Sequence, residues 1–144
     1  DYLTRAGGAF SGAHVAVFAA PGEEEVARQV LASVPQGKQI DVIAKTDPGC
    51  AAAIIARCAF YIGNDSGLMH IAAALSKKQV ALFGSTSPKH TPPLNQQAKK
   101  LWLDFPCSPC FQRTCRLKHG NCMRQLMPEQ VITALEQFEQ HQKR

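Results

Sequence analysis

The sequence predicts an α/β protein built on a Rossmann-like, doubly wound parallel sheet. Short apolar runs alternate along the chain with stretches whose apolar residues recur at helical spacing. The order is strand, helix, strand, helix, strand, helix, strand, which is typical of parallel sheets with helical crossovers. Several of the strands are continuously apolar, as expected where both faces of a sheet are covered. Right-handed crossovers would then place helices on both faces.

The elements of the first half follow one another closely. The apolar run 14–20 predicts a buried strand, which Pro21-Gly22 ends. A helix is expected over 23–34, because its apolar residues share one face and three glutamates in its first turn suit the helix dipole. A short strand at 39–44 and a small helix at 48–57 complete this half.

The second half begins with the same alternation of strands and helices, which then stops. We expect a strand at 58–63, a helix at 67–75 and a strand at 79–84. Residues 88–95 form a proline-rich irregular loop, and no clear period continues through Gly120. The last helix is expected to start at Met127-Pro128-Glu129, since proline is well suited to the first position of a helix.

Composition indicates a single globular domain spanning residues 1–144. The apolar fraction of 45% and the charged fraction of 19% argue against disorder. No apolar stretch reaches the roughly 18 residues that a membrane span needs, and the first residues lack the basic end and hydrophobic core of a signal peptide. We therefore expect a cytoplasmic location.

Basic residues are concentrated in one region. The formal net charge is +5, and between residues 98 and 125 six lysines and arginines face a single acid, Asp104. Such a surface attracts phosphates or the anionic headgroups of a membrane. A solvated charged face without a partner explains the same pattern.

The most informative segment is the turn expected between the strand 58–63 and the helix that follows. Here Asp65, Ser66 and Gly67 come immediately before or at the helix start, and His70 lies one turn in. The free N–H groups and dipole of a helix N-terminus favour a phosphate or carboxylate, and Gly67 lets a ligand approach the backbone closely. Alternatively, Asp65 or Ser66 is only a helix cap and His70 a packed or surface histidine.

Three runs of residues resemble one family of enzymes. The run Gly63-Asn64-Asp65-Ser66-Gly67-Leu68-Met69-His70-Ile71-Ala72-Ala73-Ala74 is followed by Ala81-Leu82-Phe83-Gly84-Ser85-Thr86-Ser87-Pro88 and Thr91-Pro92-Pro93-Leu94. Together they resemble the nucleotide-sugar-binding half of the ADP-heptose:lipopolysaccharide heptosyltransferases of glycosyltransferase family 9. The pattern is closest to the heptosyltransferase II members, and it extends from about Ala13 to the last helix.

The resemblance implies a fold and an activity. It implies the C-terminal, donor-binding half of a two-domain GT-B glycosyltransferase, which transfers heptose from ADP-heptose to the inner core of lipopolysaccharide with inversion. No cofactor is required for such a transfer. Family members are more than twice this length, and their amino-terminal domain binds the acceptor and supplies the general base. We therefore expect a fragment that is inactive on its own.

The resemblance also implies roles for the residues of the turn. The N–H groups of Ser66 and Gly67 would hold the diphosphate of the ADP-sugar donor. Asp65 would orient sugar hydroxyls and steady the positive charge that develops as the diphosphate leaves, which makes it the candidate transition-state residue. His70 would support the loop or donate to a phosphate.

Two further contacts are implied in the first half of the chain. Glu23 stands where the family's ribose-binding glutamate is expected, after Ala-Pro. A surface glutamate suited to the helix dipole is the alternative. Thr46 follows the next strand, where members contact adenine mainly through the backbone. The residues Asp47-Pro48-Gly49 depart from the family pattern at this place.

A cysteine-rich insertion at about 105–123 forms a second candidate site. Cys107, Cys110, Cys115 and Cys122 have the spacing C-x2-C-x4-C-x6-C, and four thiolates can close around a tetrahedral structural zinc. An iron–sulfur cluster and four free thiols are the alternatives. Disulfides are not expected in a cytosolic protein.

The alternative function is a basic, cysteine-cluster zinc module that contacts nucleic acid or a protein partner. Few aromatic residues accompany the basic ones, and no known nucleic-acid-binding motif is present. The expected partners are therefore an ADP-sugar and the lipopolysaccharide core acceptor, with peripheral contact to the cytoplasmic face of the inner membrane and no nucleic acid.

Overall fold

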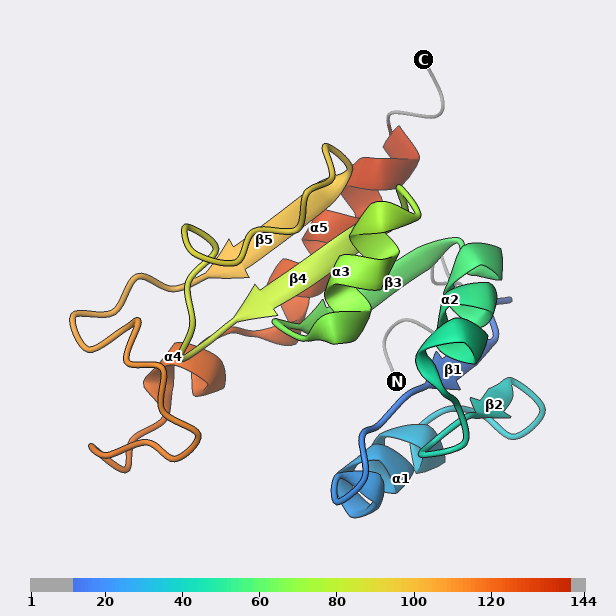
Figure 1. Cartoon of the computed structure of the whole chain (residues 1–144), viewed down its shortest axis with the longest axis horizontal. Helices are drawn as coiled ribbons and strands as arrows, with labels where there is room; N and C mark the ends of the chain where they lie inside the picture. The colour runs from blue at the N-terminus through green and yellow to red at the C-terminus, as the bar shows by residue number, and fades with distance from the viewer. Residues whose placement is uncertain (1–11, 141–144) are drawn as a thin grey trace. The chain divides into compact units, whose positions relative to one another are not determined.

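The computed structural model describes residues 12–140, except for the side chains of the last two (Figure 1). The chain divides into two compact units, Asp1–Cys50 and Ala51–Arg144. Each unit has its own parallel sheet, and each is described below by itself.

The first unit is a strand–helix–strand arrangement. Strand β1 (Val15–Val17) pairs in parallel with β2 (Gln39–Asp41), with Val15 opposite Gln39, and α1 (Glu24–Ala32) connects the two. Ala27 and Leu31 of α1 pack with Ile43, which follows β2. The small apolar face of α1 therefore forms the core of this unit.

Helix α2 (Pro48–Arg57) begins where the first unit ends. The carboxylate of Asp47 accepts a hydrogen bond from the N–H of Cys50 over 2.7 Å, as a helix-capping residue does. This bond lowers the pKa of Asp47. Asp47 and Pro48 thus start the helix at the residue that the sequence predicted.

The second unit contains a three-stranded parallel sheet in the order β3-β4-β5. Its strands are β3 (Phe60–Asn64), β4 (Lys78–Phe83) and β5 (Ala98–Trp102). Helix α3 (Gly67–Ala74) joins β3 to β4 and contacts both. Helix α5 (Pro128–Gln140) contacts β4 and β5, and Figure 1 shows α3 in front of the sheet and α5 behind it.

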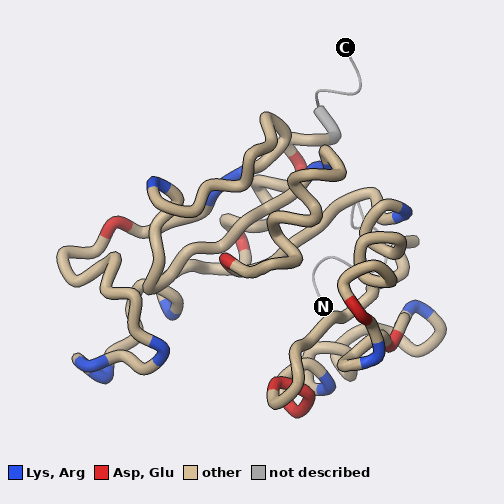
Figure 2. The backbone as a smooth tube through the Cα atoms, in the orientation of Figure 1, with Lys and Arg blue, Asp and Glu red and all other residues tan. Residues whose placement is uncertain are grey.

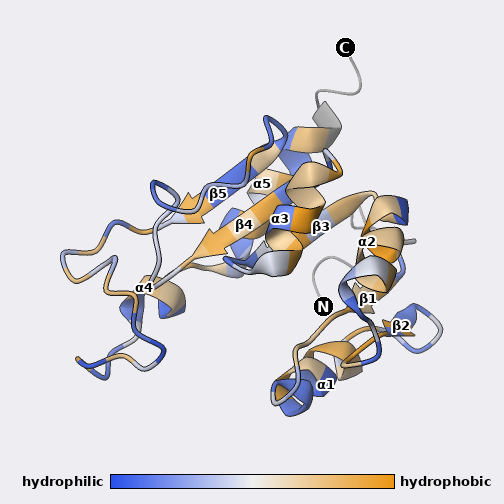
Figure 3. Cartoon of the chain, viewed as in Figure 1, coloured by the Kyte–Doolittle hydropathy of each residue, from blue (hydrophilic) through white to orange (hydrophobic). Residues whose placement is uncertain are grey.

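The core of the second unit surrounds the central strand β4. Val80 and Phe83 of this strand are fully buried, as are Met69 of α3 and Ile55 of α2. Figure 3 shows the apolar character of β4 between its neighbours. Gln79 is also buried; with its amide oriented to satisfy both groups, it donates to the carbonyl of Met69 (3.2 Å) and accepts from the N–H of Ala73 (3.3 Å). The buried amide therefore ties β4 to α3 without leaving a polar group unpaired.

The alternation of strands and helices predicted from the sequence is confirmed, with shifts at the ends of the elements. The predicted strand 14–20 shortens to β1, and the predicted helix 23–34 to α1. The described strands join as two parallel sheets, one in each unit. No regular element was expected between the proline-rich loop and Gly120, and this was wrong, because β5 lies there. The short helix α4 (Asn121–Arg124) follows Gly120 and was not predicted.

Within residues 12–140, no helix has the length and apolar character needed to cross a membrane.

Candidate functional site

The turn between β3 and α3 is fixed at the end of the sheet. The N–H of Asp65 donates to the carbonyl of Leu82 in β4 over 3.2 Å. Ser66 then adopts an extended conformation (φ −155°, ψ 168°), and α3 begins at Gly67. The turn is therefore at the carboxyl end of parallel strands, where ligands bind in sheets of this kind.

The start of α3 leaves backbone donors available. The carbonyl of Ser66 accepts hydrogen bonds from Met69 and His70, but the side chain of Ser66 caps no N–H group. A Cβ atom at Gly67 would meet nothing within 4 Å, so the space beside the backbone is open. Ser66 occupies the N-cap position without the bond that the capping alternative requires. Among the described residues, no hydrogen bond engages the N–H groups of Gly67 and Leu68, which leaves them available for an anion.

Asp65 is held by a residue from another loop. Thr91 donates from Oγ1 to Oδ2 of Asp65 over 2.8 Å. The turn that carries Thr91 is itself ordered by the buried Ser87, whose carbonyl accepts the N–H groups of His90 and Thr91. The side chain of Asp65 is thus oriented across the site instead of capping α3. In the sequence, Thr91 stands in one of the runs that resemble the family, and no local signal marks it as a site residue.

Tyr61, in strand β3, supports the turn that follows this strand. It is buried, and its hydroxyl forms a hydrogen bond with the side chain of Ser66. Burial raises the pKa of the Tyr61 hydroxyl, and the bond to Ser66 offsets part of this rise. A Cβ at Gly63 would stand only 2.4 Å from the Tyr61 hydroxyl oxygen, so glycine makes room for the ring. Tyr61 was not predicted as a site residue, because it lies within an apolar strand.

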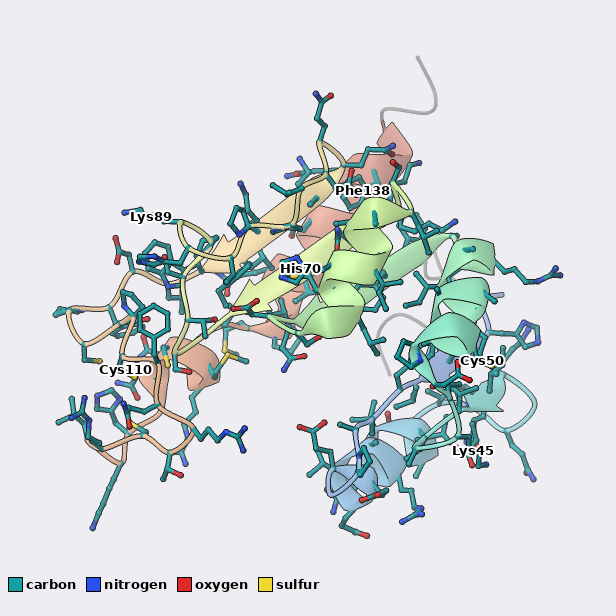
Figure 4. All side chains as sticks on the ribbon, in the orientation of Figure 1. Lys45, Cys50, His70, Lys89, Cys110 and Phe138 are labelled. Atoms are coloured by element: carbon teal, nitrogen blue, oxygen red, sulfur yellow. The ribbon has the colours of Figure 1, made fainter. Side chains whose placement is uncertain are left out.

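His70 lies on α3, one turn beyond Gly67, and is exposed (Figure 4). Within the described part of the chain its ring makes no hydrogen bond, and it is not packed in the core. The structure therefore brings Asp65, Ser66, Gly67, His70 and Thr91 to one end of the second unit.

Glu23 and Thr46 belong to the first unit. Glu23 is exposed just before α1, and its Oε2 accepts a weak hydrogen bond from the N–H of Ala20 over 3.3 Å. The neighbouring Glu24 accepts from the N–H of Gly22 (2.8 Å), and backbone hydrogen bonds lower the pKa of Glu24. Thr46 is half-buried between β2 and α2. Both residues follow strand ends of their own sheet, as predicted.

The cysteine segment, residues 103–127, attaches to the end of β4. The N–H groups of Cys110 and Phe111 donate to the carbonyl of Ser85 over 3.0 and 2.8 Å. Figure 4 shows Cys110 in this irregular region. None of the four cysteines of the segment is in a disulfide. Among the described residues, no three cysteine, histidine or acidic side chains are already arranged to hold a metal ion.

The four thiols nevertheless influence one another. Burial raises the pKa of Cys122, and the neighbouring thiols of Cys110, Cys107 and Cys115 raise it further. Backbone N–H groups, with that of Gly120 first, lower the pKa of Cys115. The segment therefore contains both a thiol that is stabilised as thiolate and thiols close enough to interact electrostatically.

The same segment carries exposed basic and apolar side chains. Figure 2 shows Lys and Arg along its outer loops. Phe111 and Leu117 are 56% and 62% exposed, and Arg113, Arg116 and Lys118 are exposed beside them. A surface of this composition can attract anionic groups.

Comparisons with known proteins agree with these observations. The model of glycosyltransferase family 9 (heptosyltransferase) matches residues 9–120. Lipooligosaccharide heptosyltransferase 2 of Campylobacter jejuni is 48% identical over 85 residues, which are 58% of this chain and 27% of that protein. Lipopolysaccharide heptosyltransferase 2 of Escherichia coli K12 is 37% identical over 95 residues, covering 64% of this chain and 27% of the relative. The chain thus spans about a quarter of the length of these relatives.

Solved structures give the same result. The structure of E. coli ADP-heptose LPS heptosyltransferase II superposes with a TM-score of 0.76 and 27% identity, over 93% of this chain and 38% of that one. The family 9 glycosyltransferase from Veillonella parvula superposes with a TM-score of 0.70 and 28% identity, over 88% and 36%. These likenesses confirm the α/β fold class, and nothing in the comparisons supports the zinc-module alternative. Because the family model matches most of its length, the chain belongs to glycosyltransferase family 9, the heptosyltransferases.

Proposed function

We propose that this chain is the donor-binding part of an inverting glycosyltransferase, which transfers heptose from ADP-heptose to the inner core of lipopolysaccharide in the cytoplasm. The observation that carries the proposal is the turn after β3. There an oriented carboxylate, an exposed imidazole and the uncapped start of α3 lie together. The names and structures of the relatives support the donor and the acceptor.

The uncapped N–H groups at the start of α3 would bind the diphosphate. Their partial positive charge, together with the helix dipole, stabilises negative charge on the leaving oxygens, and it does so most strongly in the transition state. The open space at Gly67 admits the phosphate to the backbone. His70 would donate to a phosphate oxygen from one turn further along α3.

Asp65 would face the sugar. Its carboxylate accepts sugar hydroxyls and stabilises the positive charge that forms as the bond to the diphosphate breaks. The bond from Thr91 fixes one carboxylate oxygen, and the other accepts no hydrogen bond from a side chain within residues 12–138. Glu23 would bind the ribose hydroxyls and Thr46 the adenine. No cofactor is needed for these steps.

We assign none of these residues as the base that takes the proton from the attacking hydroxyl. A general base must reach that hydroxyl directly, and the acceptor must be held in line. We assign both tasks to the acceptor-binding part of the whole enzyme. The purified chain, given ADP-heptose and a lipid A-core acceptor, should therefore turn over at the background rate. Robust transfer would show that the base lies in this chain.

Calorimetry with ADP-heptose tests the donor site. The chain should bind ADP-heptose, and Asp65→Ala and Gly67→Val should each weaken binding, because one removes the carboxylate that faces the sugar and the other fills the approach to the backbone. Asp104→Ala, which removes an exposed acid of the cysteine segment, is the matched control and should bind like the parent. Equal binding by the parent and both site variants would place the site elsewhere.

The basic and apolar side chains of the cysteine segment would bring the enzyme to the inner membrane, where the acceptor is held. Vesicles containing anionic lipid should bind the chain, and Arg113→Glu with Arg116→Glu should release it. The control pair Arg28→Glu and Arg57→Glu makes the same charge change at exposed positions outside the segment. If both pairs weaken vesicle binding equally, only net charge matters and the surface is not a specific contact.

A further inference from the structure

We propose that Cys107, Cys110, Cys115 and Cys122 together bind one zinc ion, which holds the cysteine segment against the end of β4. This site is separate from the donor site and has a structural role. Four cysteine thiolates fill a tetrahedral zinc and leave no coordination position for a substrate.

The segment needs a stabilising interaction that apolar burial does not supply. None of residues 103–127 is buried, and the only regular element among them is the four-residue helix α4. Ordering each backbone residue opposes folding by about 1–2 kcal/mol, which segments normally offset by burying apolar side chains. A metal that binds only the folded arrangement provides the missing free energy.

The first pair of cysteines is anchored at the end of β4. Ser108 donates from Oγ to the carbonyl of Gly84 over 2.7 Å, and the N–H of Cys110 donates to the carbonyl of Ser85 over 3.0 Å. These two bonds fix the short loop between Cys107 and Cys110 at Ser108 and at Cys110. These hydrogen bonds therefore order the loop without a metal ion.

Cys122 reaches the same place from another part of the segment. The sulfur of Cys122 lies 3.8 Å from the position that a Cβ on Gly84 would occupy. The sulfur of Cys107 lies 3.8 Å from Nε2 of His119, whose Nδ1 accepts the N–H of Asn121 over 3.0 Å. Because Nδ1 is an acceptor, the ring proton is assigned to Nε2, which then faces the Cys107 sulfur as an outer-shell donor to a thiolate.

Tight turns follow two of the cysteines. Phe111 (φ 54°) comes directly after Cys110, and Lys118 (φ 58°) closes a turn in which its N–H donates to the carbonyl of Cys115 over 3.1 Å. Non-glycine residues in this conformation are strained, so such turns persist where other interactions hold them. Both turns curl the chain around a cysteine, as loops that wrap a metal must.

The chemistry of the segment suits a zinc thiolate centre. Four thiolates around Zn²⁺ carry net negative charge, and the exposed Arg113, Arg116 and Lys118 lie between the ligands in sequence. The thiols are not at ligand positions in the described residues, so metal binding requires them to move closer together. The N–H of Cys110 and the sulfur of Cys122 already lie beside Ser85 and Gly84.

Elemental analysis of the chain purified without added metal is the first test. We expect about one zinc per chain, with no stoichiometric iron. Cys110→Ser and Cys122→Ser should lose the zinc. Cys50→Ser and Cys58→Ser, outside the segment, are the matched controls and should keep it. A metal-free parent, iron in place of zinc, or full zinc in both segment variants would overturn the proposal.

A second measurement covers the case in which the segment variants do not fold. Cobalt added to the zinc-free parent should give the absorption spectrum of a tetrahedral tetrathiolate site, and zinc should displace it. Removal of zinc should also speed amide exchange in residues 103–127 while leaving β4 protected. The proposal would be overturned by a cobalt spectrum without thiolate bands. It would also be overturned if amide exchange in the segment were equally fast with and without zinc. Calorimetry with ADP reports the donor site independently of either outcome.

Discussion

Thr91 donates a hydrogen bond to the carboxylate of Asp65 over 2.8 Å, across 26 positions of sequence. The bond joins the proline-rich loop after β4 to the turn after β3. It leaves Asp65 with one oxygen fixed and one available, a geometry that a flexible surface carboxylate would not hold. The proline-rich loop therefore contributes directly to the proposed donor site.

Replacement of Thr91 by valine should weaken the binding of ADP-heptose. Valine has the same shape but cannot donate, so Asp65 loses its orientation while remaining charged. We expect about a fivefold rise in Kd, since a single hydrogen bond contributes about 1 kcal/mol net. Calorimetry measures the change. Thr133→Val is the control, because Thr133 bonds only the carbonyl of Glu129 within α5. An unchanged Kd for Thr91→Val would show that the bond does not shape the site.

Gly63→Ala should destabilise the fold. The added Cβ would stand 2.4–2.8 Å from atoms of the buried Tyr61 ring, which has to shift. Forced shifts of this kind cost about 1–3 kcal/mol of unfolding free energy. Denaturant unfolding followed by circular dichroism measures it. Gly67→Ala, whose Cβ meets open space, should leave the unfolding free energy nearly unchanged. Equal stability of both variants would contradict the close approach of Tyr61 to Gly63.

The stability of the fold should fall as pH rises above about 10, because of Tyr61. Burial raises the pKa of Tyr61 above its ordinary value of 10.0, so the folded state holds the proton more tightly than the unfolded state. The contribution is complete below pH 10 and is lost as the pH rises through the folded pKa. Tyr61→Phe should show a shallower decline over this range.

The tyrosinate absorbance gives a direct check on this shift. The sequence contains two tyrosines, Tyr2 and Tyr61, so Tyr2→Phe leaves Tyr61 as the only signal. Its midpoint should lie above 10 in the folded chain and return toward 10 in denaturant. A folded midpoint at or below 10 would mean that Tyr61 is solvated.

Phe83→Ala should be severely destabilising, while Phe111→Ala should not. Phe83 is fully buried at the end of β4, and truncation of a buried phenylalanine costs about 3–5 kcal/mol. Phe111 is 56% exposed and contacts mainly the ring of His90, so we expect less than about 1 kcal/mol. Thermal unfolding of the two variants compares them directly. Similar midpoints would contradict the assignment of β4 as the centre of the core.

Much of this architecture could be predicted from local sequence. The start of α2 at Pro48 and of α3 at Gly67 was correct, because caps and helix-starting residues act within a single turn. The strand β4 was recognised because its residues Val80 to Phe83 form a continuous apolar run, as expected where both faces of a strand are covered. One turn and the helix that follows it contain Asp65, Ser66, Gly67 and His70. These residues could therefore be grouped from the sequence alone.

The strand β5 could not be predicted. Its sequence, Ala98–Trp102, contains adjacent lysines, and it lies at the edge of the sheet. Lys99 places its ammonium 5.8 Å from the ring centroid of Phe138 in α5, an arrangement that needs the helix to be in position. This segment becomes a strand because it pairs with β4. The pattern of apolar and polar residues in the segment itself does not predict that pairing.

The remaining site residues depend on tertiary contacts. The residues around Thr91 in the sequence do not indicate that Thr91 bonds Asp65. The spacing of the cysteines likewise does not indicate that Gly84 and Ser85 anchor their segment. Helix caps and apolar periodicity depend on residues that are close in the sequence, so they can be recognised without the tertiary structure. A hydrogen bond between distant loops exists only after the sheet has brought the ends of its strands together.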